Sequence, residues 1–178
     1  EWGQPDRLLK LLDAPDTNQL RKLKIISLLG EMEADEALPR LKEALNDKDL
    51  AKQAAVALGN MGKDGIPALA DILKHSKRPE LQAAAAKGLG DLGNIHSDSR
   101  IVPPLLEMLD APGIDIIVQT EIAWALGRVP DRRSVEPLFA LDRKLQKIRH
   151  DPPDPQIKKL KEAVFWSIKQ VYTEDQYS

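Results

Sequence analysis

A short tripeptide that ends in glycine recurs four times along the chain, and this repeat constrains the fold more than any other feature. Each copy ends an apolar run of helix-forming residues, and glycine is the usual residue just past the end of a helix. Successive glycines are 29, 31 and 37 residues apart. We therefore expect four similar helices, each closed by the glycine of its copy: Leu28-Leu29-Gly30, Ala57-Leu58-Gly59, Gly88-Leu89-Gly90 and Ala125-Leu126-Gly127.

A second pattern lies between these helices and predicts a partner helix in each unit. It reads Leu38-Pro39-Arg40-Leu41, Ile66-Pro67-Ala68-Leu69, Val102-Pro103-Pro104-Leu105 and Val135-Glu136-Pro137-Leu138. Proline fits the first turn of a helix, where no backbone N–H is needed. The leucine of this first helix recurs five times, at Leu8, Leu41, Leu69, Leu105 and Leu138. The chain should therefore consist of five pairs of antiparallel helices, the last second helix covering residues 158–171.

The composition agrees with an all-helical chain. Aromatic residues make up only 4% of it, and no sustained alternation of apolar and polar residues predicts a strand. Hydrophobic residues at 42% and charged residues at 30% are typical of a folded globular protein. The longest stretch without a charge, residues 53–62, has ten residues. A helix that crosses a bilayer needs about 20, so we expect no membrane span.

Helices that cannot bury their apolar stripes alone must stack side by side. We therefore predict an all-α fold, an α-α superhelix or solenoid, in a single domain over residues 1–178. Its repeats should cover about residues 5–30, 38–62, 66–93, 101–129 and 134–172. The last repeat lacks the glycine and has larger side chains in the run 164–168, as a terminal cap would. Because the first residue is Glu rather than Met, we expect a piece of a longer product.

The two-helix unit with its Ala-Leu-Gly ending resembles the HEAT-like repeats first described in phycobilisome lyase subunits, and armadillo-like HEAT repeats more broadly. Residues 53–62 and 84–93 are the closest copies, and the resemblance covers about residues 5–172. It implies a helical solenoid and says little about function, because the motif residues are packing residues. The family usually has Arg near the start of the second helix, whereas this chain has Lys22, Ala51, Gln82, Gln119 and Lys161 there.

Aligning the five second helices predicts which of their residues form the core. Three columns of the alignment are apolar, and their spacing of i, i+4 and i+7 places them on one helix face. We expect all fifteen residues to be buried. The columns are Leu29, Leu58, Leu89, Leu126 and Ile168; Ile25, Ala54, Ala85, Ile122 and Val164; and Met32, Met61, Leu92, Val129 and Val171.

Another three columns vary freely and predict a solvent-facing ridge on the concave side of the superhelix. They contain Lys24, Gln53, Ala84, Glu121 and Ala163; Ser27, Val56, Lys87, Trp124 and Trp166; and Glu31, Asn60, Asp91, Arg128 and Gln170. Exposed tryptophan is unusual, and tryptophan is enriched among binding hot spots. We therefore expect a protein partner to bind here, anchored near Trp124; the alternative that Trp166 packs over the end of the core stays open. The candidate binding residues are Lys24, Gln53, Lys87, Glu121, Trp124, Arg128 and Trp166.

Cations flank a proline-rich segment near the C-terminus, residues 151–155. The basic residues 143–150 precede it and Lys158, Lys159 and Lys161 follow it. Contact with an anion and ordinary solvated helix faces both fit this pattern. The second interpretation is favoured, because Lys and Arg near a helix C-terminus complement the helix dipole.

No catalytic or metal-binding motif is present, so we expect no enzyme activity, no cofactor and no metal. The chain has no cysteine, and its three histidines precede Ser76, Ser97 and Asp151. The di-iron hydroxylases of HEAT-like architecture place His-Glu pairs at successive helix ends, and no such pair occurs here. A DNA glycosylase built from such helices would need a strongly positive groove, whereas the ridge mixes both signs of charge and the net charge is −2.

We therefore predict a non-catalytic protein-interaction scaffold. Two alternatives stay open: an accessory subunit of a phycobilin lyase-type enzyme, which would hold a tetrapyrrole or its acceptor, and a HEAT-like DNA-binding protein. A soluble, cytoplasmic protein is slightly favoured, and the sequence leaves the partner and the oligomeric state open.

Overall fold

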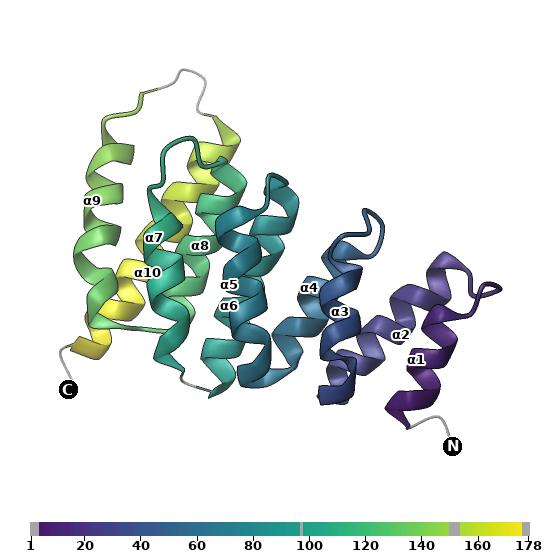
Figure 1. Ribbon diagram of the computed structural model, residues 1–178. Helices are drawn as coiled ribbons and strands as arrows, with labels where there is room; N and C mark the ends of the chain where they lie inside the picture. The colour runs from purple at the N-terminus through teal and green to yellow at the C-terminus, as the bar shows by residue number, and fades with distance from the viewer. Residues whose placement is uncertain (1–3, 97, 150–153, 176–178) are drawn as a thin grey trace.

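The computed structural model describes residues 4–96, 98–149 and 154–175, and this part of the chain contains helices and turns but no strand (Figure 1). Four short 3-10 turns precede first helices. The α-helices are α1 Pro5–Asp13, α2 Gln19–Glu31, α3 Leu38–Ala44, α4 Ala51–Asn60, α5 Ile66–His75, α6 Pro79–His96, α7 Val102–Leu109, α8 Ile116–Arg128, α9 Val135–Gln146 and α10 Pro155–Asp175.

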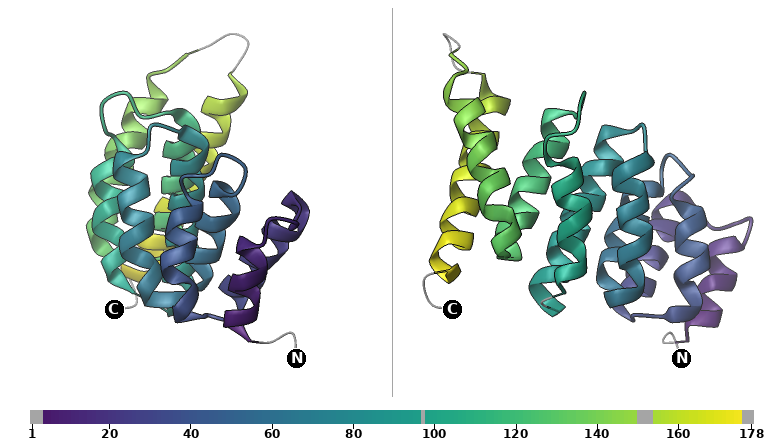
Figure 2. Two further views of the ribbon diagram at one scale, coloured as in Figure 1. Left: turned by 45° about the vertical axis from the view of Figure 1, so that its right-hand side comes forward. Right: turned by 60° about the vertical axis from the view of Figure 1, so that its left-hand side comes forward.

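The helices stack as five antiparallel pairs, which confirms the predicted all-α solenoid. Figures 1 and 2 show the odd-numbered first helices in one layer and the even-numbered second helices in the other. Each second helix packs against the next along the series α2, α4, α6, α8 and α10. This inter-repeat packing is the main link between units, because the first helices contact one another much less.

The first-helix leucines Leu8, Leu41, Leu69, Leu105 and Leu138 lie in the core. Each of the five is at most 2% exposed. Of the fifteen core residues expected on the second helices, thirteen are buried. The prediction is wrong for Met32, which is 36% exposed, and for Ile168, which is half-buried against the core. Both lie on the outermost second helices, α2 and α10, which have a neighbouring second helix on one side only within the described chain.

The expectation that each repeat glycine closes its helix is wrong. The four glycines lie inside α2, α4, α6 and α8, where the backbone of the next second helix comes too close for a side chain. A Cβ atom added to each would lie within 3.0 Å of a Cα atom in the next second helix. The pairs are Gly30 with Ala57 at 2.6 Å, Gly59 with Gly88 at 3.0 Å, Gly90 with Ala125 at 2.8 Å and Gly127 with Ser167 at 2.8 Å.

The turn that follows a second helix lies a few residues after the repeat glycine. Gly62 has a φ of 63° just beyond α4, which is the left-handed conformation that glycine adopts without strain. After α2 the same conformation falls on Glu33, with a φ of 49°. Thus in the second repeat one glycine makes the inter-helix contact and another glycine makes the turn.

Side chains in the column that usually holds Arg join the two helices of one repeat. Gln82 Nε2 donates to the Leu73 carbonyl at 2.9 Å, and Gln119 Nε2 donates to the Leu109 carbonyl at 2.8 Å. Lys161 Nζ donates to the Ile148 carbonyl at 3.4 Å. These donors satisfy carbonyl groups at or just beyond the C-terminal end of the first helix, which its own backbone leaves unpaired.

We predict that Gly59→Val lowers the free energy of unfolding by about 1–3 kcal/mol, because the added atoms collide with Gly88 of α6. The intrinsic helix preference of valine over glycine acts in the opposite direction and is smaller. Asn60→Val is the matched control, since Asn60 is the next residue of α4 and is exposed. Urea unfolding of both variants makes the measurement, and equal stability of the two would contradict the steric account.

Candidate functional site

The structure divides the ridge columns into exposed, half-buried and buried residues. Lys24, Asn60 and Lys87 are exposed, and Val56 is 36% exposed. Gln53, Glu121, Trp124, Arg128 and Trp166 are half-buried. The expectation of a continuous wet ridge is wrong at Ala84, which is 8% exposed, and at Ala163, which is fully buried. The side chain of alanine is too short to extend beyond the larger side chains around it, so these two ridge positions are buried.

Trp124 of α8 and Trp166 of α10 contact each other. Their ring centroids are 5.0 Å apart and the rings are tilted by 50°. Trp124 also packs against the hydrophobic core, so one face of its indole is held in place and part of the ring reaches the surface. Aromatic pairs of this geometry contribute about 0.5–1.5 kcal/mol beyond the area that they bury. The pair is therefore both a packing element and a rigid apolar surface.

An ion cluster lies beside the tryptophan pair and joins α6 to α8. Asp91 of α6 lies 3.3 Å from Arg128 Nη1 and 3.9 Å from Lys87 Nζ. Arg128 is 28% exposed at its side chain, so this pair is partly shielded from water. The half-buried Glu121 lies one turn before Trp124 on α8 and takes no part in these two ion pairs. We call Lys87, Asp91, Glu121 and Arg128 together the charged cluster, and these four side chains have no net charge.

The seven candidate binding residues thus fall into two places. Five of them lie on α6, α8 and α10, which are adjacent second helices: Lys87, Glu121, Trp124, Arg128 and Trp166. Gln53 lies on α4, and Lys24 lies on α2 at the other end of the stack. We call the five residues together with Asp91 the tryptophan site. Its role in binding remains a prediction.

The basic segment near the C-terminus is partly neutralised. Arg143 Nη2 pairs with Glu136 Oε1 at 2.6 Å, and Lys144 pairs with Asp110. These ion pairs favour the interpretation of solvated helix faces over an anion site. His150 and residues 151–153 of the proline-rich segment 151–155 lie outside the described residues.

Among the residues that the structure describes, no three His, Asp or Glu side chains come together as a metal site requires. Nor does any described helix have the length and apolar character needed to cross a membrane.

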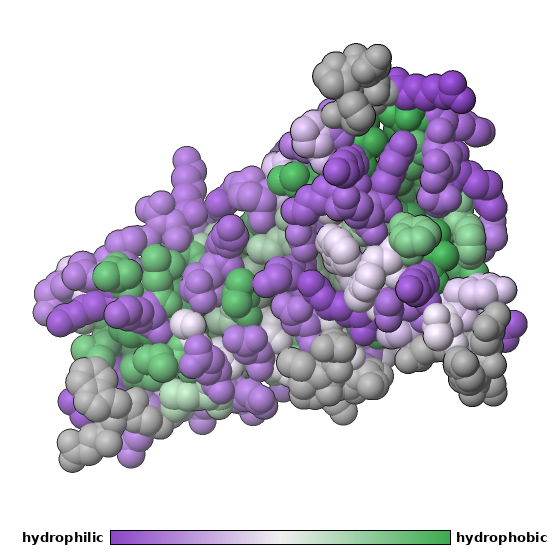
Figure 3. Space-filling model, turned by 180° about the vertical axis from the view of Figure 1, so that it is seen from behind, coloured by the Kyte–Doolittle hydropathy of each residue, from purple (hydrophilic) through white to green (hydrophobic). Residues whose placement is uncertain are grey.

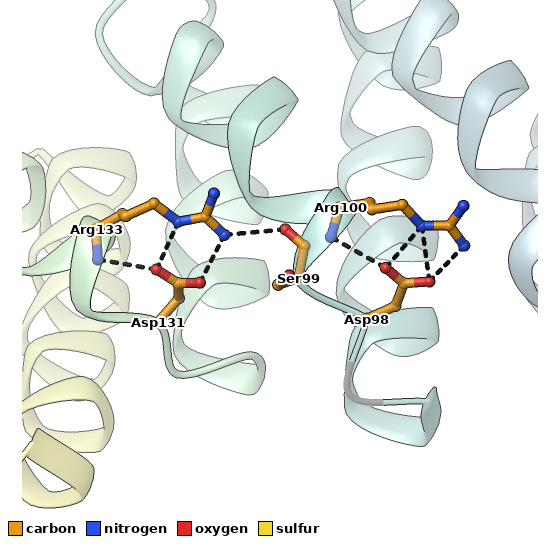
Figure 4. Close-up of polar contacts among 5 residues, drawn as sticks. All are labelled: Asp98, Ser99, Arg100, Asp131 and Arg133. Atoms are coloured by element: carbon orange, nitrogen blue, oxygen red, sulfur yellow. Dashed lines mark hydrogen bonds and ion pairs between the residues drawn. The ribbon is translucent and has the colours of Figure 1, made fainter. Parts of the chain in front are cut away.

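Sequence reasoning missed a contact between the 3-10 turns that precede α7 and α9. Asp131 accepts hydrogen bonds from the backbone N–H and the Nε of Arg133, both at 2.9 Å, and Arg133 Nη2 reaches the Ser99 carbonyl of the preceding repeat at 3.1 Å (Figure 4). Asp98 and Arg100 form the same local pair. An Asp-x-Arg motif whose Asp lies four positions before α7 and again before α9, 33 positions apart, is the signal that could have revealed it.

This contact shifts the pKa of both partners. The Arg133 guanidinium, hydrogen-bonded to the Asp131 carboxylate, lowers the pKa of Asp131 below its usual value despite partial burial. The same hydrogen bond raises the pKa of Arg133. The ion pair therefore stabilises the charged forms of both side chains. Arg133 also links adjacent repeats through its hydrogen bond to the Ser99 carbonyl.

Comparison with known proteins gives a family and a fold. The sequence profile of the HEAT repeats matches residues 5–90 and 66–151. Among solved structures, human deoxyhypusine hydroxylase in complex with glycerol is similar with a TM-score of 0.50 and 17% identity. The similarity covers 95% of this chain and 75% of that chain, and at this identity it shows the fold alone. No curated protein matches the sequence.

We predict that Asp131→Ala lowers the free energy of unfolding by about 1 kcal/mol at neutral pH, because a capping side chain is lost. The pKa of Asp131 is lower in the folded than in the unfolded state, so its contribution is present above the unfolded pKa of about 3.9. The contribution is lost as the pH falls through the lower, folded value. Wild type and variant should therefore converge in stability on acidification.

Chemical denaturation at several pH values measures this convergence. Asp49→Ala is the control, since Asp49 is exposed and, in the part of the chain that the structure describes, only its backbone N–H forms a hydrogen bond. A difference between wild type and Asp131→Ala that stays constant down to the most acidic pH would contradict the electrostatic explanation.

Proposed function

This chain belongs to the HEAT repeat family, and from that premise we propose that it is a non-catalytic scaffold that binds a protein partner at the tryptophan site. The observation that carries the proposal is the contact between two half-buried indoles, Trp124 of α8 and Trp166 of α10, next to charged side chains of α6 and α8. HEAT repeats provide extended surfaces of this kind for binding.

The residue types at this site are those that dominate protein interfaces. Tryptophan and arginine are enriched among hot spots, and Trp124 and Arg128 lie one turn apart on α8. Both side chains are partly fixed before binding. Trp124 is held by the core and by Trp166, and Arg128 is held by its ion pair with Asp91. A pre-ordered site loses less side-chain entropy on association, which favours binding.

The expected partner is a protein segment with an apolar side chain flanked by charges of both signs. The apolar group would cover the exposed part of the tryptophan pair, and the charges would complement Lys87, Glu121 and Arg128. Because the cluster has no net charge, we expect its affinity to depend weakly on salt. The same balance does not favour nucleic acid, which needs an excess of cations.

We further propose that the chain performs no catalysis of its own. The sequence contains no His-Glu pair, and the described acidic and histidine side chains form no group of three. The similarity to human deoxyhypusine hydroxylase does not extend to an activity, because at 17% identity it concerns the fold. An accessory subunit of a phycobilin lyase-type enzyme would be one specific kind of scaffold. That alternative predicts that the purified protein retains added bilin.

We predict that Trp124→Ala weakens partner binding at least ~10-fold, as the loss of a central aromatic anchor does. It should also cost about 1–3 kcal/mol of unfolding free energy, less than a fully buried tryptophan, because Trp124 is half-buried. Phe165→Ala is the matched control: Phe165 is an aromatic residue of α10, is 70% exposed and lies outside the tryptophan site.

A quantitative pull-down with wild type, Trp124→Ala and Phe165→Ala tests the proposal, with circular dichroism of each variant to establish folding. The proposal requires loss of the partner with Trp124→Ala alone. Equal capture by the two variants, together with a stability loss in Trp124→Ala, would show that Trp124 is only a packing residue.

A further inference from the structure

The outer side of α2, together with its C-cap residue Met32, exposes three apolar side chains. Leu20 is 64% exposed, Leu28 43% and Met32 36%. Beside them, an apolar pocket of about 260 Å³ opens between α1 and α2. Figure 3 shows hydrophobic surface gathered at this end of the molecule, among hydrophilic side chains. The lining residues are Leu8, Leu11, Thr17, Arg21, Lys24, Ile25 and Leu28.

This side of α2 cannot accept another repeat in the manner of the stack. Every later second helix presents a small residue to the glycine of its predecessor, namely Ala57, Gly88, Ala125 or Ser167. The corresponding residue of α2 is Leu28, which is too large for two helix backbones to touch. Since no described element covers this face, its occupant must pack leucine side chains into the pocket instead.

The charges on α2 are arranged so that the helix complements a second copy of itself. Arg21 and Lys24 lie in its first half, and neither has an ion-pair partner in the described chain. Glu31 is its last residue; its carboxylate accepts a hydrogen bond from Ser27 Oγ at 3.1 Å and forms no ion pair within the described residues. When two α2 helices pack antiparallel, the cationic half of each lies beside the acidic end of the other.

We propose that α2 is the contact of a symmetric homodimer, in which two copies pack their α2 helices antiparallel about a two-fold axis. Arg21 and Lys24 of one copy then lie near Glu31 of the other, and Leu28 of each copy enters the apolar pocket of the other. Two-fold dimers are the commonest closed assemblies. A helix of 13 residues is about 20 Å long, so the interface is small and the dimer reversible.

The opposite end of the stack does not fit α2 equally well. Phe165 and Tyr172 of α10 are exposed, but the same helix exposes three lysines, Lys158, Lys159 and Lys169, against one acid among its described side chains, Glu162. A head-to-tail contact would place these lysines against Arg21 and Lys24, and like charges across an interface disfavour association. Such a contact would also leave free ends that continue to polymerise.

Sedimentation velocity of the full chain across micromolar concentrations, at low ionic strength, tests the proposal. Wild type should change from monomer to dimer, with no larger species. Leu28→Lys should raise the dissociation constant at least ~10-fold, because it places a further cation in a pocket that Arg21 and Lys24 already line. Phe165→Lys is the matched control at the other end and should dimerise like wild type. A wild type that stays monomeric, or a dimer that only Phe165→Lys dissociates, would overturn the proposal.

Charge exchange distinguishes the antiparallel arrangement from other uses of the same face. Lys24→Glu and Glu31→Lys should each weaken the dimer, and a chain with both substitutions should recover it. Failure of the double variant to recover contradicts the antiparallel pairing. The result is separate from the proposed partner binding, because Trp124→Ala lies on α8 and should leave the dimer intact.

Discussion

The closest approach between repeats, a glycine of one second helix against a small residue of the next, is the contact on which the superhelix depends. It recurs four times, from Gly30 against Ala57 to Gly127 against Ser167. Where no side chain stands between them, two helix backbones can touch, and the leucines on either side then interlock into a continuous core. The same contact determines which side of each second helix faces the next repeat and which side stays available to solvent.

The tryptophan site is a consequence of the last of these contacts. Gly127 allows α10 to lie directly on α8, and the buried Ser167 Oγ donates to the Ala123 carbonyl at 2.6 Å across the same junction. These two interactions bring Trp166 to within 5.0 Å of Trp124. The rigid indole surface therefore follows from a packing requirement, and its proposed use in binding builds on a geometry that the fold already imposes.

The sequence predicts the helix pairs and most of the core because both depend on the period of the α-helix. For this reason the leucine columns can be recognised in the sequence. The role of the glycines cannot be recognised in the same way, because a glycine near a helix end can either make a turn, as Gly62 does, or contact the next helix, as Gly59 does. The burial of Ala84 and Ala163 and the link from Arg133 to Ser99 depend on neighbouring repeats, which a single helical period does not describe.

A double-mutant cycle on Gly30→Ala and Ala57→Gly tests the glycine contact most directly. Helix preference alone would make Gly30→Ala stabilising by about 1 kcal/mol. The close contact predicts the opposite sign, a loss of unfolding free energy, and partial recovery when Ala57→Gly removes the facing Cβ. A stabilising Gly30→Ala, or two effects that simply add, would contradict the account.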